Sequence, residues 1–99
     1  MVVKMYIISD FTAAELNKHL NKLRGSPWSS ERRPKGGFKW FHERCSGNLR
    51  IRRTELLRTQ HKRIYVTTVG KDEAKLISEF IEWILTHFRE KLLEMRIEP

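Results

Sequence analysis

The chain has very little cysteine, no long hydrophobic run and few acidic residues in its middle, and each shortage excludes something. Its 99 residues contain a single cysteine, Cys45. One cysteine can form neither an internal disulfide framework nor a multi-cysteine zinc site, and it fits a reducing compartment. The longest apolar stretch near the start, residues 2–8, is interrupted by Lys4 and is too short to span a bilayer. We therefore expect an intracellular protein, in the cytoplasm, on a nucleoid or inside a host cell, with no membrane segment and no secretory signal.

The length and composition predict one folded domain that covers residues 1–99. Chains normally divide into domains only at greater lengths, and aromatic residues at 10% are enough to build a core although only 39% of the residues are hydrophobic. Ten Glu stand against two Asp and one Gln, a bias typical of heat-adapted proteins.

Acidic residues are scarce where basic residues are concentrated. Residues 22–63 hold 13 Lys and Arg against three Glu, a net charge of +10, whereas residues 1–21 sum to zero and residues 64–99 to −2. A localised excess of this kind is what a polyanion-binding surface needs, because each neutralised phosphate releases counterions and adds affinity. The alternative is a solvated basic surface that serves solubility.

Hydrophobic patterning predicts a helix and four strands, two of which form a hairpin. Residues 2–9 are rich in Val, Ile and Tyr, and residues 13–24 show helical spacing behind a Thr12/Glu15 capping box. Residues 38–45 and 49–53 form the expected hairpin around a Ser-Gly-Asn turn, and residues 63–69 form the next strand. Residues 54–62 are compatible with a strand extension, a helical turn or a long connection.

Two further segments are interpreted from how much Gly and Pro they contain. Residues 25–37 contain three Gly, two Pro and three Ser, which predicts a mobile basic loop. Residues 71–98 contain no Gly or Pro and carry an apolar stripe at spacings of three and four, which predicts one long helix. Its apolar arc is wider than a sheet requires, so we expect a homodimer formed through residues 74–95.

These elements predict an α+β fold in the order β-α-β-β-β-α. We expect a small antiparallel sheet with two helices on one face, the second helix being the long C-terminal one, and an open basic face on the other side.

Period-two alternation selects the side chains of that open face. If Leu49 and Ile51 point into the core, Arg50 and Arg52 point away from it, and Lys39 and Phe41 join them if their neighbours face inward. Cations that hold phosphates beside an aromatic ring that stacks on a base are typical of single-strand-binding surfaces. The predicted nucleic-acid contacts are Arg32, Arg33, Lys35, Lys39, Arg50, Arg52, Arg63 and Tyr65.

We therefore expect a non-catalytic protein that binds DNA or RNA mainly through phosphates, with no catalytic residue, metal or cofactor. One alternative is a protein-interaction or regulatory module, of the kind that viruses and mobile elements carry, that docks its partner on the apolar C-terminal helix. A second alternative is a small metal-independent RNase, for which His42 and His61 are the candidate acid and base.

Overall fold

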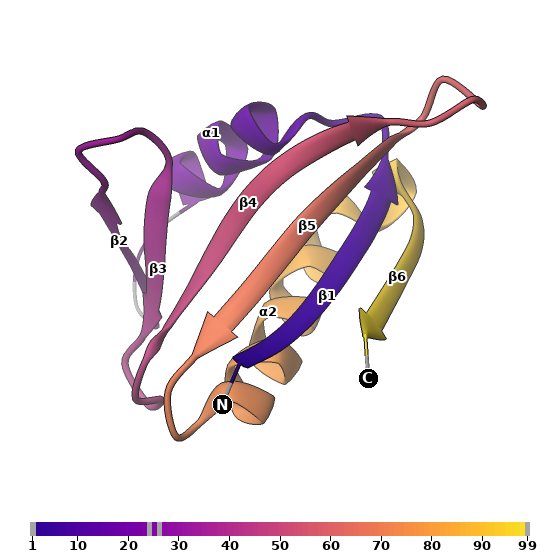
Figure 1. Cartoon of the computed structure of the whole chain (residues 1–99). Helices are drawn as coiled ribbons and strands as arrows, with labels where there is room; N and C mark the ends of the chain where they lie inside the picture. The colour runs from indigo at the N-terminus through magenta and orange to yellow at the C-terminus, as the bar shows by residue number, and fades with distance from the viewer. Residues whose placement is uncertain (1, 24, 26, 99) are drawn as a thin grey trace.

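The computed structural model describes residues 2–23, 25 and 27–98 and has the expected α+β class, with an antiparallel sheet of six strands and two helices. In chain order the elements are β1 (Val2–Ser9), α1 (Ala13–Leu23), β2 (Trp28–Arg32), β3 (Phe38–His42), β4 (Asn48–Leu56), β5 (Lys62–Val69), α2 (Glu73–Phe88), a short 3-10 turn (Arg89–Lys91) and β6 (Leu92–Glu98). The strands lie in the order β2-β3-β4-β5-β1-β6. Figure 1 shows α1 and α2 behind the sheet, whose other face is uncovered.

The predicted long helix over residues 71–98 is wrong in its second half. Helix α2 ends at Phe88, and after the 3-10 turn the chain becomes strand β6, which pairs antiparallel with β1. In β6, Met95 lies opposite Ile7 and Ile97 opposite Met5. Apolar residues two apart therefore fit a strand that completes the sheet edge, and the tertiary pairing outweighs the absence of helix breakers.

The predicted loop over residues 25–37 contains a strand. Strand β2 pairs with β3 from Trp28 opposite His42 to Arg32 opposite Phe38, so the connection proper is residues 33–37. Trp28 is buried and its ring stacks on that of Trp83, with centroids 4.9 Å apart. Burial of this large ring anchors a segment whose Gly, Pro and Ser content predicts a loop. Ser26 lies outside the described residues.

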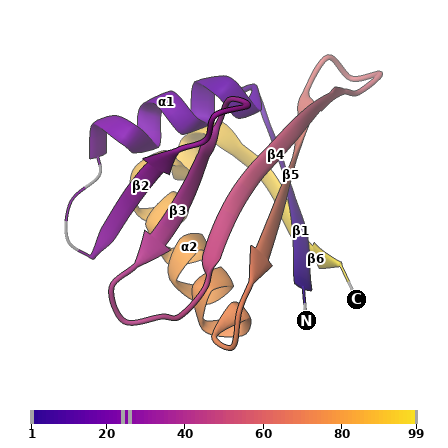
Figure 2. The same ribbon diagram turned by 60° about the vertical axis from the view of Figure 1, so that its left-hand side comes forward.

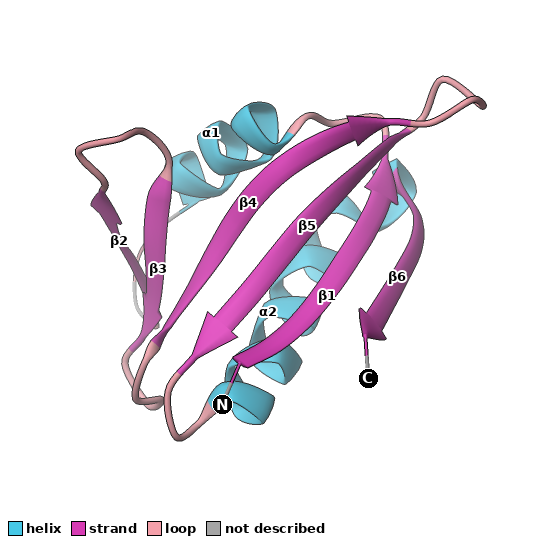
Figure 3. Cartoon of the chain, in the orientation of Figure 1, coloured by secondary structure: helices cyan, strands magenta, loops and turns pink. Residues whose placement is uncertain are grey.

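The core lies between the helices and the covered face of the sheet (Figure 3). Trp40 of β3 is fully buried, and its indole N–H donates a hydrogen bond to Oδ1 of Asn17 on α1 at 2.9 Å. Such a buried polar pair is stable because both groups are satisfied. The wide apolar arc of α2 is used within the chain, because its buried side chains Leu76, Ile77, Phe80 and Ile84 belong to this core.

Two glycines allow the loop before β4 and the one after β5 to touch. Gly47 and Gly70 both have positive φ, +85° and +127°. A Cβ on Gly47 would overlap the carbonyl oxygen of Val69, so no larger residue fits there without moving the backbone.

Candidate nucleic-acid interface

A β-bulge in β4 determines which arginines reach the open face. Ile51 lies opposite Val66 and Thr54 opposite Ile64, so Arg52 and Arg53 together face the single residue Tyr65. A bulge of this kind adds one residue to a strand and bends it. It reverses the alternation after Ile51 and places the guanidinium of Arg53 over the Tyr65 ring, 4.6 Å from its centroid.

The open face carries a pair of tyrosines that lie directly opposite each other, Tyr6 on β1 and Tyr65 on β5. The guanidinium of Arg63 lies 4.8 Å from the Tyr6 ring centroid, as Arg53 does over Tyr65. Both tyrosines are half-buried, so their rings keep part of their surface in solvent. We call these four residues, Tyr6, Tyr65, Arg53 and Arg63, the tyrosine platform.

Glu55 contacts two members of the tyrosine platform, Arg63 and Tyr65. Its carboxylate pairs with Nη1 of Arg63 at 3.1 Å and accepts a hydrogen bond from the Tyr65 hydroxyl at 3.4 Å. The hydrogen bond between Arg63 and Tyr65 raises the pKa of the guanidinium above its usual range. Arg63 is already paired with Glu55, whereas Arg53 makes no ion pair among the described residues.

A groove opens beside the platform where β3 and β4 separate. These strands are paired only at Lys39 opposite Arg50 and Trp40 opposite Leu49, and Figure 2 shows them diverging toward the β2–β3 connection. On the side of α1 the depression has a volume of about 530 Å³, and a second one of about 320 Å³ lies on the other side of the connection. Arg33 and Lys35 line both. We call the two together the hairpin groove.

Six of the 14 residues that line the hairpin groove are Lys or Arg, and one is acidic. Besides the shared pair, Arg52 and Arg53 line the larger depression, and Lys39 and Arg50 line the smaller one, where Glu31 is the acidic neighbour. Within residues 2–23, 25 and 27–98, none of the groove cations makes an ion pair. Unpaired cations that converge on a concave surface create a positive potential that attracts phosphate groups. The groove cations are Arg33, Lys35, Lys39, Arg50, Arg52 and Arg53.

The α1 side of the groove is fixed by hydrogen bonds. The backbone N–H of Ala13 donates to Oγ1 of Thr54 at 2.6 Å, which ties the start of α1 to β4 just beyond the bulge. Thr12 and Glu15 form the reciprocal capping box, with bonds of 3.1 and 3.2 Å, and these bonds lower the pKa of the Glu15 carboxyl. These bonds hold the start of α1, which lines one side of the groove, against β4.

Seven of the eight sequence-predicted residues lie in the groove or on the platform. Arg33, Lys35, Lys39, Arg50 and Arg52 line the groove, and Arg63 and Tyr65 belong to the platform. Arg32 does not join them. It lies at the end of β2 opposite Phe38, is exposed, and lines neither depression.

Sequence reasoning missed Arg53 and Tyr6. Alternation from Ile51 sends Arg53 into the core, and only the bulge brings it to the surface. The sequence did hold one indication of the bulge: strict alternation would bury the charged side chain of Arg53, which is unfavourable. Tyr6 lay in a strand whose partner was not predicted, and its position opposite Tyr65 follows from the β1–β5 pairing.

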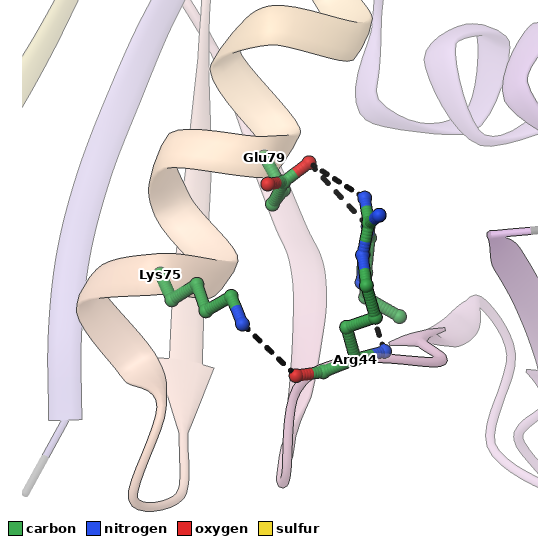
Figure 4. A network of polar contacts seen from close by, with 4 residues as sticks. Arg44, Lys75 and Glu79 are labelled. Carbon is green, nitrogen blue, oxygen red and sulfur yellow. Dashed lines mark hydrogen bonds and ion pairs between the residues drawn. The ribbon is translucent and has the colours of Figure 1, made fainter.

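The candidate RNase histidines lie apart from each other and differ in access. The His42 side chain is fully buried; its Nδ1 accepts a hydrogen bond from the Arg44 N–H, and its Nε2 lies 3.4 Å from the Glu79 carboxylate. Figure 4 shows Glu79 and Lys75 of α2 both reaching Arg44, so this cluster fastens the β3–β4 connection to α2. His61 is partly exposed, with Nδ1 2.9 Å from Oδ1 of Asp10.

Two remaining chemical possibilities concern metal and thiol chemistry. In the part of the chain that the structure describes, no three His, Cys, Asp or Glu side chains gather as a metal site requires. Burial raises the pKa of the Cys45 thiol, which disfavours the thiolate that nucleophilic chemistry needs. None of the described helices is long and apolar enough to cross a membrane.

Comparison of the chain with protein-family models, with curated proteins and with solved structures finds no match.

Proposed function

We propose that the protein binds single-stranded or double-stranded nucleic acid without catalysis, with the hairpin groove holding phosphates and the tyrosine platform contacting bases or sugars. The observation that carries this proposal is the gathering of six cations without ion pairs around the two depressions beside the β2–β3 connection, next to two half-buried tyrosines. A surface that served only solubility would intersperse charges of both signs.

The arrangement supports a backbone-directed mode of binding. Arginine and lysine side chains contact phosphate oxygens without reading sequence, whereas a tyrosine ring can stack on any base. Arg53 takes part in both regions, because it lines the groove and covers Tyr65. A strand whose phosphates follow the groove would therefore bring its bases toward the platform.

The test is a fluorescence-anisotropy titration of the protein with single-stranded and double-stranded DNA and RNA of equal length, at three salt concentrations. Dissociation constants in the micromolar range or below, with log affinity falling steeply with log salt, are expected. Failure to bind any of the four probes at low salt contradicts the proposal.

A second candidate function is RNA cleavage, favoured by the His61–Asp10 pair. A carboxylate on Nδ1 orients an imidazole and leaves Nε2 for proton transfer. Incubation of the protein with labelled RNA decides between the two. RNA that is cleaved by the native chain and left intact by His61→Ala supports catalysis, and RNA that stays intact with the native chain leaves binding alone.

A further inference from the structure

The outer edge of β6 presents unpaired strand backbone. Strand β6 ends the sheet, and β1 is its neighbour within the described residues. An edge strand with unpaired N–H and C=O groups is a template for pairing with another strand unless bulges, prolines or charges obstruct it. In β6 such an irregularity lies at Leu93, where the register with β1 shifts, so the side chains of residues 94–98 decide whether the rest of this edge can pair with another strand.

On the helix side of the sheet, β6 is apolar and exposed. Leu93 and Ile97 are 57% and 51% exposed. The pairing with β1 shifts where Ile8 lies opposite Glu94 and Ser9 opposite Leu92, so Leu93 has no partner in β1 and the regularly paired part of β6 is residues 94–98. Met95 and Ile97 lie opposite the buried residues Ile7 and Met5, and Leu93 lines a depression of about 330 Å³ with Leu85 of α2. This stripe is an apolar surface that the chain itself leaves uncovered.

On the open face, β6 carries charges of alternating sign. Glu94 lies opposite Ile8 and Arg96 opposite Tyr6 in β1, so both side chains stand on the uncovered side. Their charged ends are 3.9 Å apart and their side chains are 43% and 65% exposed. Both charges can therefore reach a strand placed alongside.

We propose that β6 pairs antiparallel with β6 of a second copy of this chain, about a two-fold axis at Met95. In this register Glu94 faces the partner's Arg96, and Arg96 faces the partner's Glu94. On the other face Leu93 meets the partner's Ile97. The pairing joins two sheets into one and covers the apolar stripe of each copy with that of the other.

Charge selects this register against its neighbours. A shift by two residues toward the C-terminus places Arg96 opposite the partner's Arg96 and Glu94 opposite the partner's Glu98, and a shift the other way places Glu94 opposite the partner's Glu94. Like charges directly opposite one another destabilise a strand pair, whereas opposite charges stabilise it. A one-residue shift sets charged side chains against Met95. Pairing centred on Met95 is thus the register that satisfies both faces.

The proposed dimer interface lies on β6, whereas the sequence predicts one formed through residues 74–95. The buried side chains of α2 within residues 74–95 pack inside their own chain, so they are not available to a partner. The proposed surface is residues 93–97, and it does not depend on the proposed nucleic-acid binding.

The test measures the solution mass of the native chain and of charge-reversed variants by sedimentation equilibrium over a wide concentration range. The native chain is expected at twice its 11.9 kDa mass. Glu94→Arg and Arg96→Glu, each alone, create two like-charge pairs and are expected to weaken the dimer by roughly 10-fold or more. An equimolar mixture of the two variants restores opposite pairs, so a heterodimer is expected with near-native affinity.

The controls use exposed charges away from β6, Glu82→Arg on α2 and Arg58→Glu in the β4–β5 turn. Circular dichroism confirms that each variant is folded, and the double swap Glu94→Arg with Arg96→Glu provides a second variant expected to dimerise like the native chain. A native chain that stays monomeric at every concentration overturns the proposal. So does a dimer that neither single reversal weakens.

Discussion

The two faces of the sheet use the same strands for different purposes. Alternate residues of β3 show the contrast: Trp40 is fully buried against α1, whereas Phe41 and Lys39 on either side of it are half-buried on the uncovered face. The covered face is largely apolar, and the uncovered one combines tyrosines with arginines, of which Arg63 is paired with Glu55. Stability and binding should therefore respond to different substitutions, although the residues are neighbours in the chain.

The largest effect is expected from Trp40→Ala on the covered face. The substitution removes a buried indole, leaves a cavity and deprives Asn17 of its hydrogen-bond donor. It should lower the free energy of unfolding by about 3–5 kcal/mol. Urea denaturation measures the loss. Phe41→Ala, one residue further and half-buried, is the matched control and should cost only about 1 kcal/mol; equal losses would show that the faces are not distinct.

Removing two groove cations should affect binding instead of stability. Arg50→Ala combined with Arg52→Ala is expected to weaken nucleic-acid binding roughly 10- to 100-fold at low salt and to reduce the slope of log affinity against log salt by about 1.4–1.8. Anisotropy titrations provide both numbers.

The control for that pair is Lys71→Ala combined with Lys91→Ala, which removes the same charge from exposed positions outside the groove. If this control lowers affinity and slope as much as the groove variant does, binding responds to net charge alone and the groove has no special role.

A smaller effect separates stacking from charge on the platform. Tyr65→Ala removes the ring under Arg53 and should weaken single-strand binding by roughly 5-fold, near the lower end for one base–aromatic stack. Tyr65→Phe keeps the ring and should bind almost as the native chain does. A duplex probe, whose bases are already stacked, should discriminate little between the two variants. Equal losses for alanine and phenylalanine would assign the effect to the hydroxyl and Glu55.

The smallest effect is expected on thermal stability, from removal of the Asp72 carboxylate. The Asp72 carboxylate accepts a hydrogen bond from the Ser46 backbone N–H at 2.8 Å, which lowers the pKa of Asp72. A lowered folded-state pKa stabilises the protein at neutral pH, and this contribution disappears as the pH falls through that pKa. Asp72→Ala should therefore melt slightly below the native chain at pH 7 and converge with it in acid. A constant difference across that range would remove ionisation as the cause.

The sequence predicts local pattern well and long-range pairing poorly. The Thr12/Glu15 box correctly gives the start of α1, and alternation correctly gives β4 up to Ile51. The second half of residues 71–98 is wrong because nothing local shows that β1 has a free edge for β6 to fill. Arg53 is missed for a related reason, since a bulge is defined by the partner strand. The candidate site was therefore predictable in its charges and unpredictable in its geometry.

The central claim is that polyanion contact is confined to the hairpin groove and the tyrosine platform, and NMR mapping tests it most directly. Spectra of the ¹⁵N-labelled protein are recorded during titration with a short single-stranded oligonucleotide. Saturable shifts are predicted for the amides of Lys35, Lys39, Arg50, Arg53 and Tyr65, with little change along the outer surface of α2. Saturable shifts concentrated on α2, with the groove and platform unchanged, would contradict the account.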